Sequence, residues 1–177
     1  DSRQVKLDGE GFFDVSKDAK RPFSVCVDGM TINVLGTRFN VKAYKEDSNV
    51  ATTLVEGKIK VGYKNKTGRE DGLILDRGEQ SVYYKQSADV KVEEVNTDIY
   101  TAWRDGFYFF DKQRLEDIMK NLGRWYGLEV VFLDESAKSI EMSGKLYRGE
   151  SPEELLATFA NMMPGRIKVK GKTVTIH

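Results

Sequence analysis

Residue types that commonly perform catalysis or bind metals are scarce in this chain. Histidine occurs once, at His177, and cysteine occurs once, at Cys26. The chain therefore has almost no residues from which a histidine-based catalytic arrangement or a histidine-rich metal site could be built. Adjacent carboxylates such as Glu153 and Glu154 lie in turns, strand ends or the first turn of a helix, where solvation or capping explains them. We predict no catalytic residue, no cofactor, no metal ligand and no enzymatic activity.

The balance of charge argues against nucleic acid as a partner. The 28 Lys and Arg residues equal the 28 Asp and Glu residues in number, and no basic run is long enough to form the footprint of a nucleic-acid binder. No window approaches the run of about 18 apolar residues that a membrane-spanning helix needs. We expect no direct membrane contact by these residues. Because the chain starts at Asp1 without a methionine, we expect a piece of a longer protein.

The residues best suited to recognising another protein lie near the end of the chain. Lys168 and Lys170 alternate with apolar residues in a predicted edge strand. Such charge discourages promiscuous pairing, and the same edge can accept one chosen partner strand. Tyr147 and Arg148 end the preceding strand and add an aromatic ring and a charge near the same level. These four residues form the predicted partner-binding site, with protection of the edge as the alternative interpretation.

Short strands separated by turns account for residues 1–95. The segment 31–41 shows the pattern best, because apolar alternation stops at Gly36 and resumes after Thr37. A glycine inside an apolar strand marks a bulge, a corner or a close backbone approach, so we expect this pair to bend the chain between two packed layers. Roughly ten strands predict an all-β sandwich, roll or solenoid-like domain, with no helix before residue 95.

Helical signals appear only after a polar connector at 96–105, which we predict as the domain boundary. The first helix carries apolar residues at helical spacing from Leu115 to Tyr126, and its predicted cap and end are Asp111 and Gly127. Residues 106–177 then read as an α+β domain. With the strands on either side of each helix, the pattern predicts a βαβ-βαβ arrangement: one small sheet with two helices packed against it.

The second helix has the stronger local signals. Ser151, Pro152 and Glu154 supply a cap, a first-turn proline and a capping-box glutamate in the required order. We expect Pro164-Gly165 to end this helix. The remaining residues alternate on either side of Gly171, which predicts a terminal hairpin.

Motifs spread over the whole chain form a specific combination. They are Arg3-x-Val5-x-Leu7-x-Gly9-Glu10-x-x-Phe13-x-Val15, Pro22-Phe23-x-Val25, Val34-Leu35-Gly36-Thr37-x-Phe39-Asn40-Val41, Gly57-Lys58, Gly78-Glu79-Gln80, Trp103-x-x-Gly106 and Ser143-Gly144-Lys145-Leu146. Together they resemble the FecR-like family of iron-type sigma regulators. Gly11 stands where the family pattern leads us to expect alanine, a small departure. The C-terminal part looks like the family's C-terminal domain, which is similar to the short N-terminal domain of secretins and TonB-dependent receptors.

The resemblance implies a periplasmic signalling region of an anti-sigma factor anchored in the inner membrane through an upstream helix. The implied partner is the signalling domain of an outer-membrane TonB-dependent receptor for iron or another nutrient. An absent cytoplasmic segment would then hold an extracytoplasmic-function sigma factor, and the first strands of the β domain could also lie upstream. A carbohydrate or cell-wall binding module and a structural envelope-assembly domain remain the alternatives.

Overall fold

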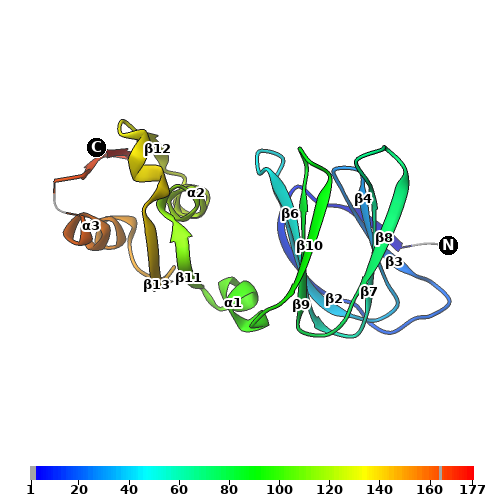
Figure 1. The fold of residues 1–177 in the computed structure, drawn as a ribbon. Coiled ribbons are helices and arrows are strands. Elements are labelled where there is room, and N and C mark those ends of the chain that lie inside the picture. The colour runs from blue at the N-terminus through cyan, green and yellow to red at the C-terminus, as the bar shows by residue number, and fades with distance from the viewer. Residues whose placement is uncertain (1–2, 164) are drawn as a thin grey trace. The chain divides into compact units, whose positions relative to one another are not determined.

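The chain forms two compact units, Asp1–Thr101 and Ala102–His177. In the computed structural model, residues 3–163 and 165–177 are described. Strands dominate the first unit, and strands and helices alternate in the second (Figure 1). The predicted β-rich composition with few helices is therefore confirmed, and residues 3–95 contain no helix.

Residues 3–94 form ten strands that divide between two five-stranded sheets. One sheet has the order β1-β3-β4-β7-β8 and the other has the order β10-β9-β6-β5-β2. After β2, the chain places two consecutive strands in one sheet and the next two in the other. The strands are β1 (Arg3–Lys6), β2 (Gly9–Asp14), β3 (Phe23–Val27), β4 (Met30–Val34), β5 (Arg38–Ala43), β6 (Asn49–Glu56), β7 (Ile59–Lys64), β8 (Glu70–Leu75), β9 (Glu79–Tyr84) and β10 (Asp89–Glu94). A short helix, α1 (Thr97–Thr101), ends this unit.

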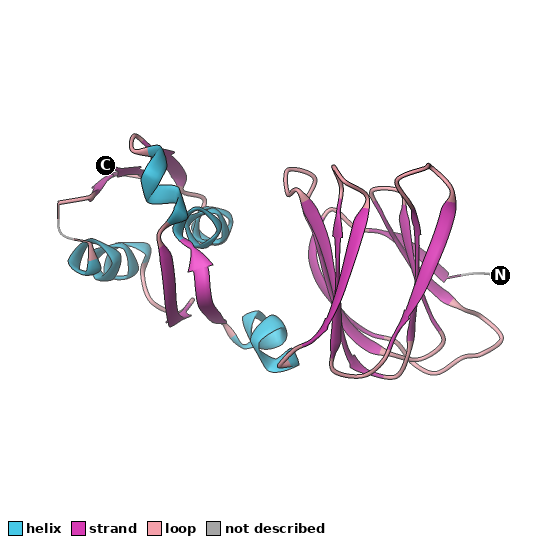
Figure 2. Ribbon diagram, in the orientation of Figure 1, coloured by secondary structure: helices cyan, strands magenta, loops and turns pink. Residues whose placement is uncertain are grey.

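The two sheets face each other as the layers of a sandwich (Figure 2). One layer contributes Ile32 and Val61 to the shared core, and the other contributes Phe39 and Leu54, all with no exposed surface. Removing one such side chain from water is worth about 1.5–3 kcal/mol. Of the three predicted β architectures, the structure is the sandwich.

The predicted corner at Gly36-Thr37 is confirmed, because β4 and β5 belong to different sheets. A Cβ atom on Gly36 would lie 2.5 Å from the Cα of Lys17, so only glycine fits this backbone approach. Thr37 is buried, and its hydroxyl donates a 3.0 Å hydrogen bond to the carbonyl of Lys58. A Cβ on Gly57 would lie 2.9 Å from that same hydroxyl oxygen. Two successive crossings between the sheets are thus packed against each other.

The second unit contains two helices of more than two turns, two short 3-10 helices and five strands among its described residues. The strands form a two-stranded antiparallel sheet, β11-β13, and a three-stranded sheet of order β12-β15-β14. The elements are η1 (Ala102–Asp105), β11 (Phe107–Arg114), α2 (Leu115–Tyr126), β12 (Glu129–Phe132), η2 (Glu135–Ser139), β13 (Glu141–Tyr147), α3 (Pro152–Met162), β14 (Ile167–Lys170) and β15 (Thr173–Ile176).

The expectation of one small sheet is wrong, since these strands form two. Helix α2 contacts β11 of one sheet and β12 of the other, so its apolar face packs against both. That face carries the fully buried residues Leu115, Ile118, Met119 and Leu122. The spacing of apolar residues predicts this face correctly, but it does not specify which strands pair beneath it.

The predicted cap of α2 is also wrong. The strand β11 continues past Asp111, whose carboxylate instead accepts a 2.7 Å hydrogen bond from the hydroxyl of Ser143 on β13. A bulge carries the strand onward, with Lys112 at a φ of 46°. The helix begins after Arg114, which makes no side-chain cap. Its predicted end is confirmed, because Gly127 adopts the left-handed conformation with a φ of 63°.

Helix α3 has the predicted capping box. The hydroxyl of Ser151 accepts from the backbone N–H of Glu154, and the carboxylate of Glu154 accepts from the backbone N–H of Ser151. Pro152 occupies the first turn, as predicted. The helix ends at Met162, while Pro164, predicted as part of its stop, lies outside the described residues.

The close approach at Gly36 predicts a large effect of a small substitution. Gly36→Ala would press its methyl group against the backbone of Lys17, and we expect it to lower the stability of the sandwich by about 1–3 kcal/mol. Gly62→Ala is the matched control, because the nearest atom to its Cβ would be the carbonyl oxygen of Thr31 at 3.7 Å. Native-state hydrogen exchange of the β4 and β5 amides measures both. Equal effects of the two substitutions would contradict the steric role of Gly36.

Candidate partner-binding site

The C-terminal hairpin forms one edge of the three-stranded sheet (Figure 1). Strands β14 and β15 pair antiparallel, with Lys168 opposite Thr175 and Lys170 opposite Thr173. Gly171 adopts a φ of 60° in the two-residue turn between them. Within the described chain, β14 pairs only with β15, so the predicted hairpin and its edge strand are both confirmed.

The two faces of β14 differ in chemistry. Lys168 and Lys170 are exposed, and they point to the face opposite Ile167, which is buried in the core. Val169 lies on the same face as Ile167, yet it is 44% exposed, whereas its cross-strand neighbour Val174 is fully buried. The apolar core therefore thins out at this edge and leaves one valine side chain partly uncovered.

The lysines of the hairpin have no carboxylate partners. Within residues 3–163 and 165–177, no ion pair involves Lys168, Lys170 or Lys172. Elsewhere lysines do find acids, as Lys58 does with Asp76 at 3.0 Å. The edge thus presents positive charge that no ion pair among the described residues neutralises.

Tyr147 and Arg148, the other two predicted residues, lie at the end of a strand of a different sheet and in the turn directly after it. Tyr147 is the last residue of β13, and its ring lies 5.0 Å from that of Phe107. The guanidinium of Arg148 lies 5.5 Å from the ring centre of Trp125. Because β13 pairs with β11 and not with the hairpin, the four predicted residues do not form one continuous edge.

A lysine that the sequence interpretation missed lies beside Tyr147. The ammonium group of Lys145 lies 3.9 Å from the ring centre of Phe107 and 5.1 Å from that of Phe109. Phe107 pairs with Tyr147 across the sheet, and Phe109 pairs with Lys145. The sequence signal for this cluster was the period-2 alternation of side chains along β11 and β13. That alternation places Lys145 beside the aromatic rings only once the pairing of the two strands is known. The lysine covers the aromatic face through cation–π contacts.

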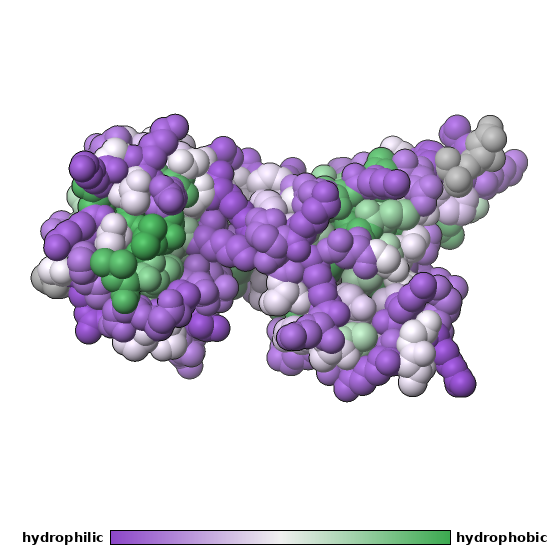
Figure 3. All heavy atoms as spheres, turned by 90° about the horizontal axis from the view of Figure 1, so that it is seen from above, coloured by the Kyte–Doolittle hydropathy of each residue, from purple (hydrophilic) through white to green (hydrophobic). Residues whose placement is uncertain are grey.

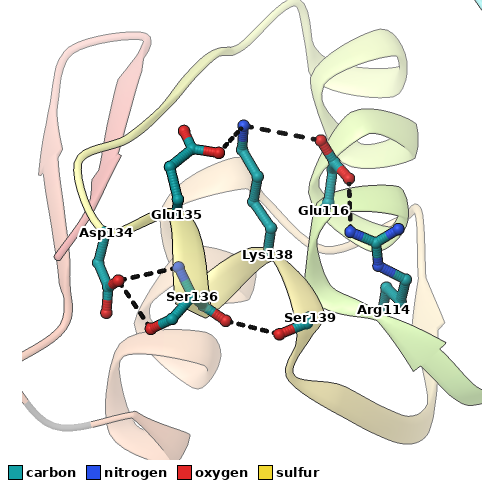
Figure 4. Close-up of polar contacts among 7 residues, drawn as sticks. All are labelled: Arg114, Glu116, Asp134, Glu135, Ser136, Lys138 and Ser139. Atoms are coloured by element: carbon teal, nitrogen blue, oxygen red, sulfur yellow. Dashed lines mark hydrogen bonds and ion pairs between the residues drawn. The ribbon is translucent and has the colours of Figure 1, made fainter.

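The carboxylate of Asp134 links η2 to the start of the hairpin. It accepts hydrogen bonds from the hydroxyl and the backbone N–H of Ser136, at 2.7 and 2.9 Å (Figure 4). These hydrogen bonds lower the pKa of Asp134 below its ordinary value, with a smaller contribution from Arg166. The guanidinium of Arg166, directly before β14, lies 4.0 Å from the same carboxylate.

A second set of charges ties η2 to α2. The ammonium group of Lys138 lies 2.8 Å from Glu135 and 3.9 Å from Glu116, and Glu116 also accepts from Arg114 at 3.1 Å (Figure 4). The hydrogen bond to Glu135 raises the pKa of Lys138. These groups are internally paired and solvent-accessible, so we assign them to positioning η2 and not to reaction chemistry.

The described residues contain no group of three or more His, Cys, Asp or Glu residues that could hold a metal ion. They also contain no helix long and apolar enough to cross a membrane. An open groove of about 600 Å³ lies over β7 and β8, where Gly62 and Gly72 pair beside the exposed Ile74. Apolar surface also gathers in a patch on the second unit, at the left of Figure 3.

Comparison with known proteins gives consistent matches for both units. Residues 1–60 match the family model described as FecR protein, and residues 107–176 match the model described as FecR, C-terminal. No curated protein matches the chain significantly.

Two crystal structures of a candidate anti-sigma factor from Parabacteroides distasonis ATCC 8503 have a similar fold. Each is 25% identical in sequence with a TM-score of 0.85; the matches cover 99% and 100% of this chain and 80% of the other chain. Between them, the two family models match more than half of the sequence, at both of its ends. The resemblance read from the motifs is thereby confirmed, and the chain belongs to the FecR family.

Proposed function

We propose that this chain is the periplasmic signalling region of a transmembrane anti-sigma factor, and that it binds the signalling domain of an outer-membrane TonB-dependent receptor. The observation that carries the proposal is the similarity in fold, over nearly the whole chain, to a candidate anti-sigma factor. Membership of the FecR family supports the same role. Receptor binding would be relayed through an inner-membrane helix to a segment that controls an extracytoplasmic-function sigma factor.

The edge strand β14 is the proposed contact for the receptor. Among the described residues, it combines a backbone edge without a pairing strand, a partly uncovered Val169 and the charges of Lys168 and Lys170, which have no ion pair. Protein partners recognise such edges through main-chain hydrogen bonds, and alternating side chains provide selectivity. Tyr147 and Arg148 would form a separate contact at the end of β13, since they lie outside this edge.

A carbohydrate-binding role has less support from the side chains. Stacking on sugars would favour a flat cluster of exposed Tyr and Trp on one β face. The tyrosines with the largest exposure among the described residues are Tyr84 and Tyr147, which lie in different units. The neighbouring Phe107 and Phe109 rings are covered by Lys145. We therefore retain recognition of a protein as the function.

We also infer that residues 1–95 and 106–177 are separate domains joined by the connector 96–105. Neither α1 nor η1, which occupy this connector, contains a buried residue. Fragments 1–101 and 102–177, expressed separately, should each give an amide NMR spectrum that overlays on that of the intact chain, with differences confined to the connector. A fragment that unfolds, or shifts spread through its core, would show that the two units depend on each other.

The receptor hypothesis predicts saturable binding of the intact chain to the signalling domain of at least one TonB-dependent receptor, measured by isothermal titration calorimetry. Replacing Lys168 and Lys170 together by Glu should weaken that binding by at least about tenfold and reduce its dependence on salt. The matched control is Lys60→Glu with Lys64→Glu, which makes the same change in net charge on β7 of the other unit.

Two outcomes would count against this model in different ways. Absence of binding to every candidate receptor domain, with the fold intact, would overturn receptor recognition. Equal affinities of the hairpin variant and the wild-type chain would leave recognition standing and move the interface away from β14.

A further inference from the structure

We propose that the partner contributes one β-strand that pairs with the free edge of β14, and that acidic and apolar residues alternate along this strand. The inference rests on the proposed function and specifies how the partner is held. Three observations carry it: the direction of the backbone groups of β14, the exposure of Val169 and the charges of Lys168 and Lys170.

The hydrogen bonds of the hairpin show which backbone groups of β14 point away from β15. The N–H of His177 donates to the carbonyl of Arg166 at 2.8 Å. Because bonded and non-bonded pairs alternate in an antiparallel ladder, every second residue from Arg166 onward directs its backbone groups toward β15. Ile167 and Val169 therefore direct their N–H and C=O groups toward the open edge.

A hydrogen bond on the other side of β15 agrees with this assignment of backbone directions. Ile176 lies across from Ile167 in a pair that is not hydrogen-bonded, so its carbonyl should point away from β14. That carbonyl accepts from the N–H of Leu133, just beyond β12, at 2.7 Å. An added strand can thus form main-chain hydrogen bonds with Ile167 and Val169 without disturbing any bond within the sheet.

The side chains on the core face of β14 determine which residues of the partner strand are apolar. A residue placed opposite Val169 would extend the row formed by Val130, Val174 and Val169 across the three strands. Val174 is fully buried in this row, but Val169 is 44% exposed because no strand lies beyond it. An apolar side chain there would cover the valine, and a charged one would lose solvation without a partner.

The outer face of β14 determines which residues of the partner strand are acidic. Residues of the added strand that alternate with the apolar ones would lie beside Lys168 and Lys170, which have no ion pair among the described residues. Opposite charges across a strand pair stabilise the pair, and like charges destabilise it. Glutamate or aspartate is therefore favoured at these positions.

The same charges argue against a second copy of this chain as the occupant. If two β14 strands paired with each other, the lysines of both would lie on one face, in adjacent strands. This arrangement would bring like charges together with no acid to separate them. The edge thus excludes its own copy and accepts a strand of the complementary pattern.

The test uses the intact chain and the receptor signalling domain that binds it. On complex formation, we expect the amides of Ile167 and Val169 to exchange with solvent at least about tenfold more slowly, because both become hydrogen-bonded. Val169→Pro removes one of these donors without removing a bond to β15, and it should weaken binding at least about tenfold. A thermal melt and the NMR spectrum check that this variant is folded; if it is not, the exchange data on the wild-type chain decide.

A peptide probe tests the pattern independently of the receptor. A short capped peptide in which valine and glutamate alternate should shift the NMR resonances of β14, and a peptide of alternating valine and lysine should not. If the receptor domain binds but the two amides stay unprotected, strand addition is overturned and the proposed function stands. If the acidic peptide binds and every receptor domain fails, the edge is confirmed and the proposed partner is wrong. Protection of the amides at high concentration of the chain alone would overturn the exclusion of a second copy.

Discussion

The sandwich depends on one steric constraint, the absence of a side chain at Gly36. The backbone of Lys17 passes so close that a Cβ atom would lie 2.5 Å from its Cα. This approach lets the chain leave one sheet after β4 and enter the other at β5 within three residues. The hydroxyl of Thr37 then bonds to the carbonyl of Lys58, at the next crossing. Because the chain crosses between the layers repeatedly, the register of the whole sandwich follows from such corners.

The second unit is organised by a helix between two small sheets, and small sheets have many edges. With a three-stranded and a two-stranded sheet, only β15 has a strand on both sides among the described residues. Exposed edges invite unwanted pairing, and charge on an edge strand is a common protection. At β14 the protective and the selective interpretations of Lys168 and Lys170 are compatible, since repulsion of a like-charged edge and attraction of an acidic strand arise from the same charges.

Local chemistry explains which predictions succeeded. The capping box of Ser151 and Glu154 and the left-handed end at Gly127 depend on a few adjacent residues, so the sequence alone was sufficient. The predicted helix cap at Asp111 was wrong because a bulge at Lys112 extends β11, and a bulge depends on the partner strand. The division into two sheets and the position of Lys145 over the aromatic rings also depend on pairing between distant segments. For the candidate site, the sequence indicated the hairpin and its lysines, but not that Tyr147 and Arg148 lie at the end of a strand in another sheet.

The edge also shows why charge pattern and backbone geometry must be considered together. Alternation of lysine and apolar residues assigns each side chain of β14 to a face, and this much is visible in the sequence. The hydrogen bond from the N–H of His177 to the carbonyl of Arg166 determines instead which residues of β14 direct their backbone groups toward β15 and which toward a partner. That hydrogen bond assigns the free N–H and C=O groups to Ile167 and Val169, the residues whose side chains face the core. A partner strand bonded to them must place its own core-facing side chains beside Val169, so the hydrogen bonds and the uncovered apolar surface select the same register.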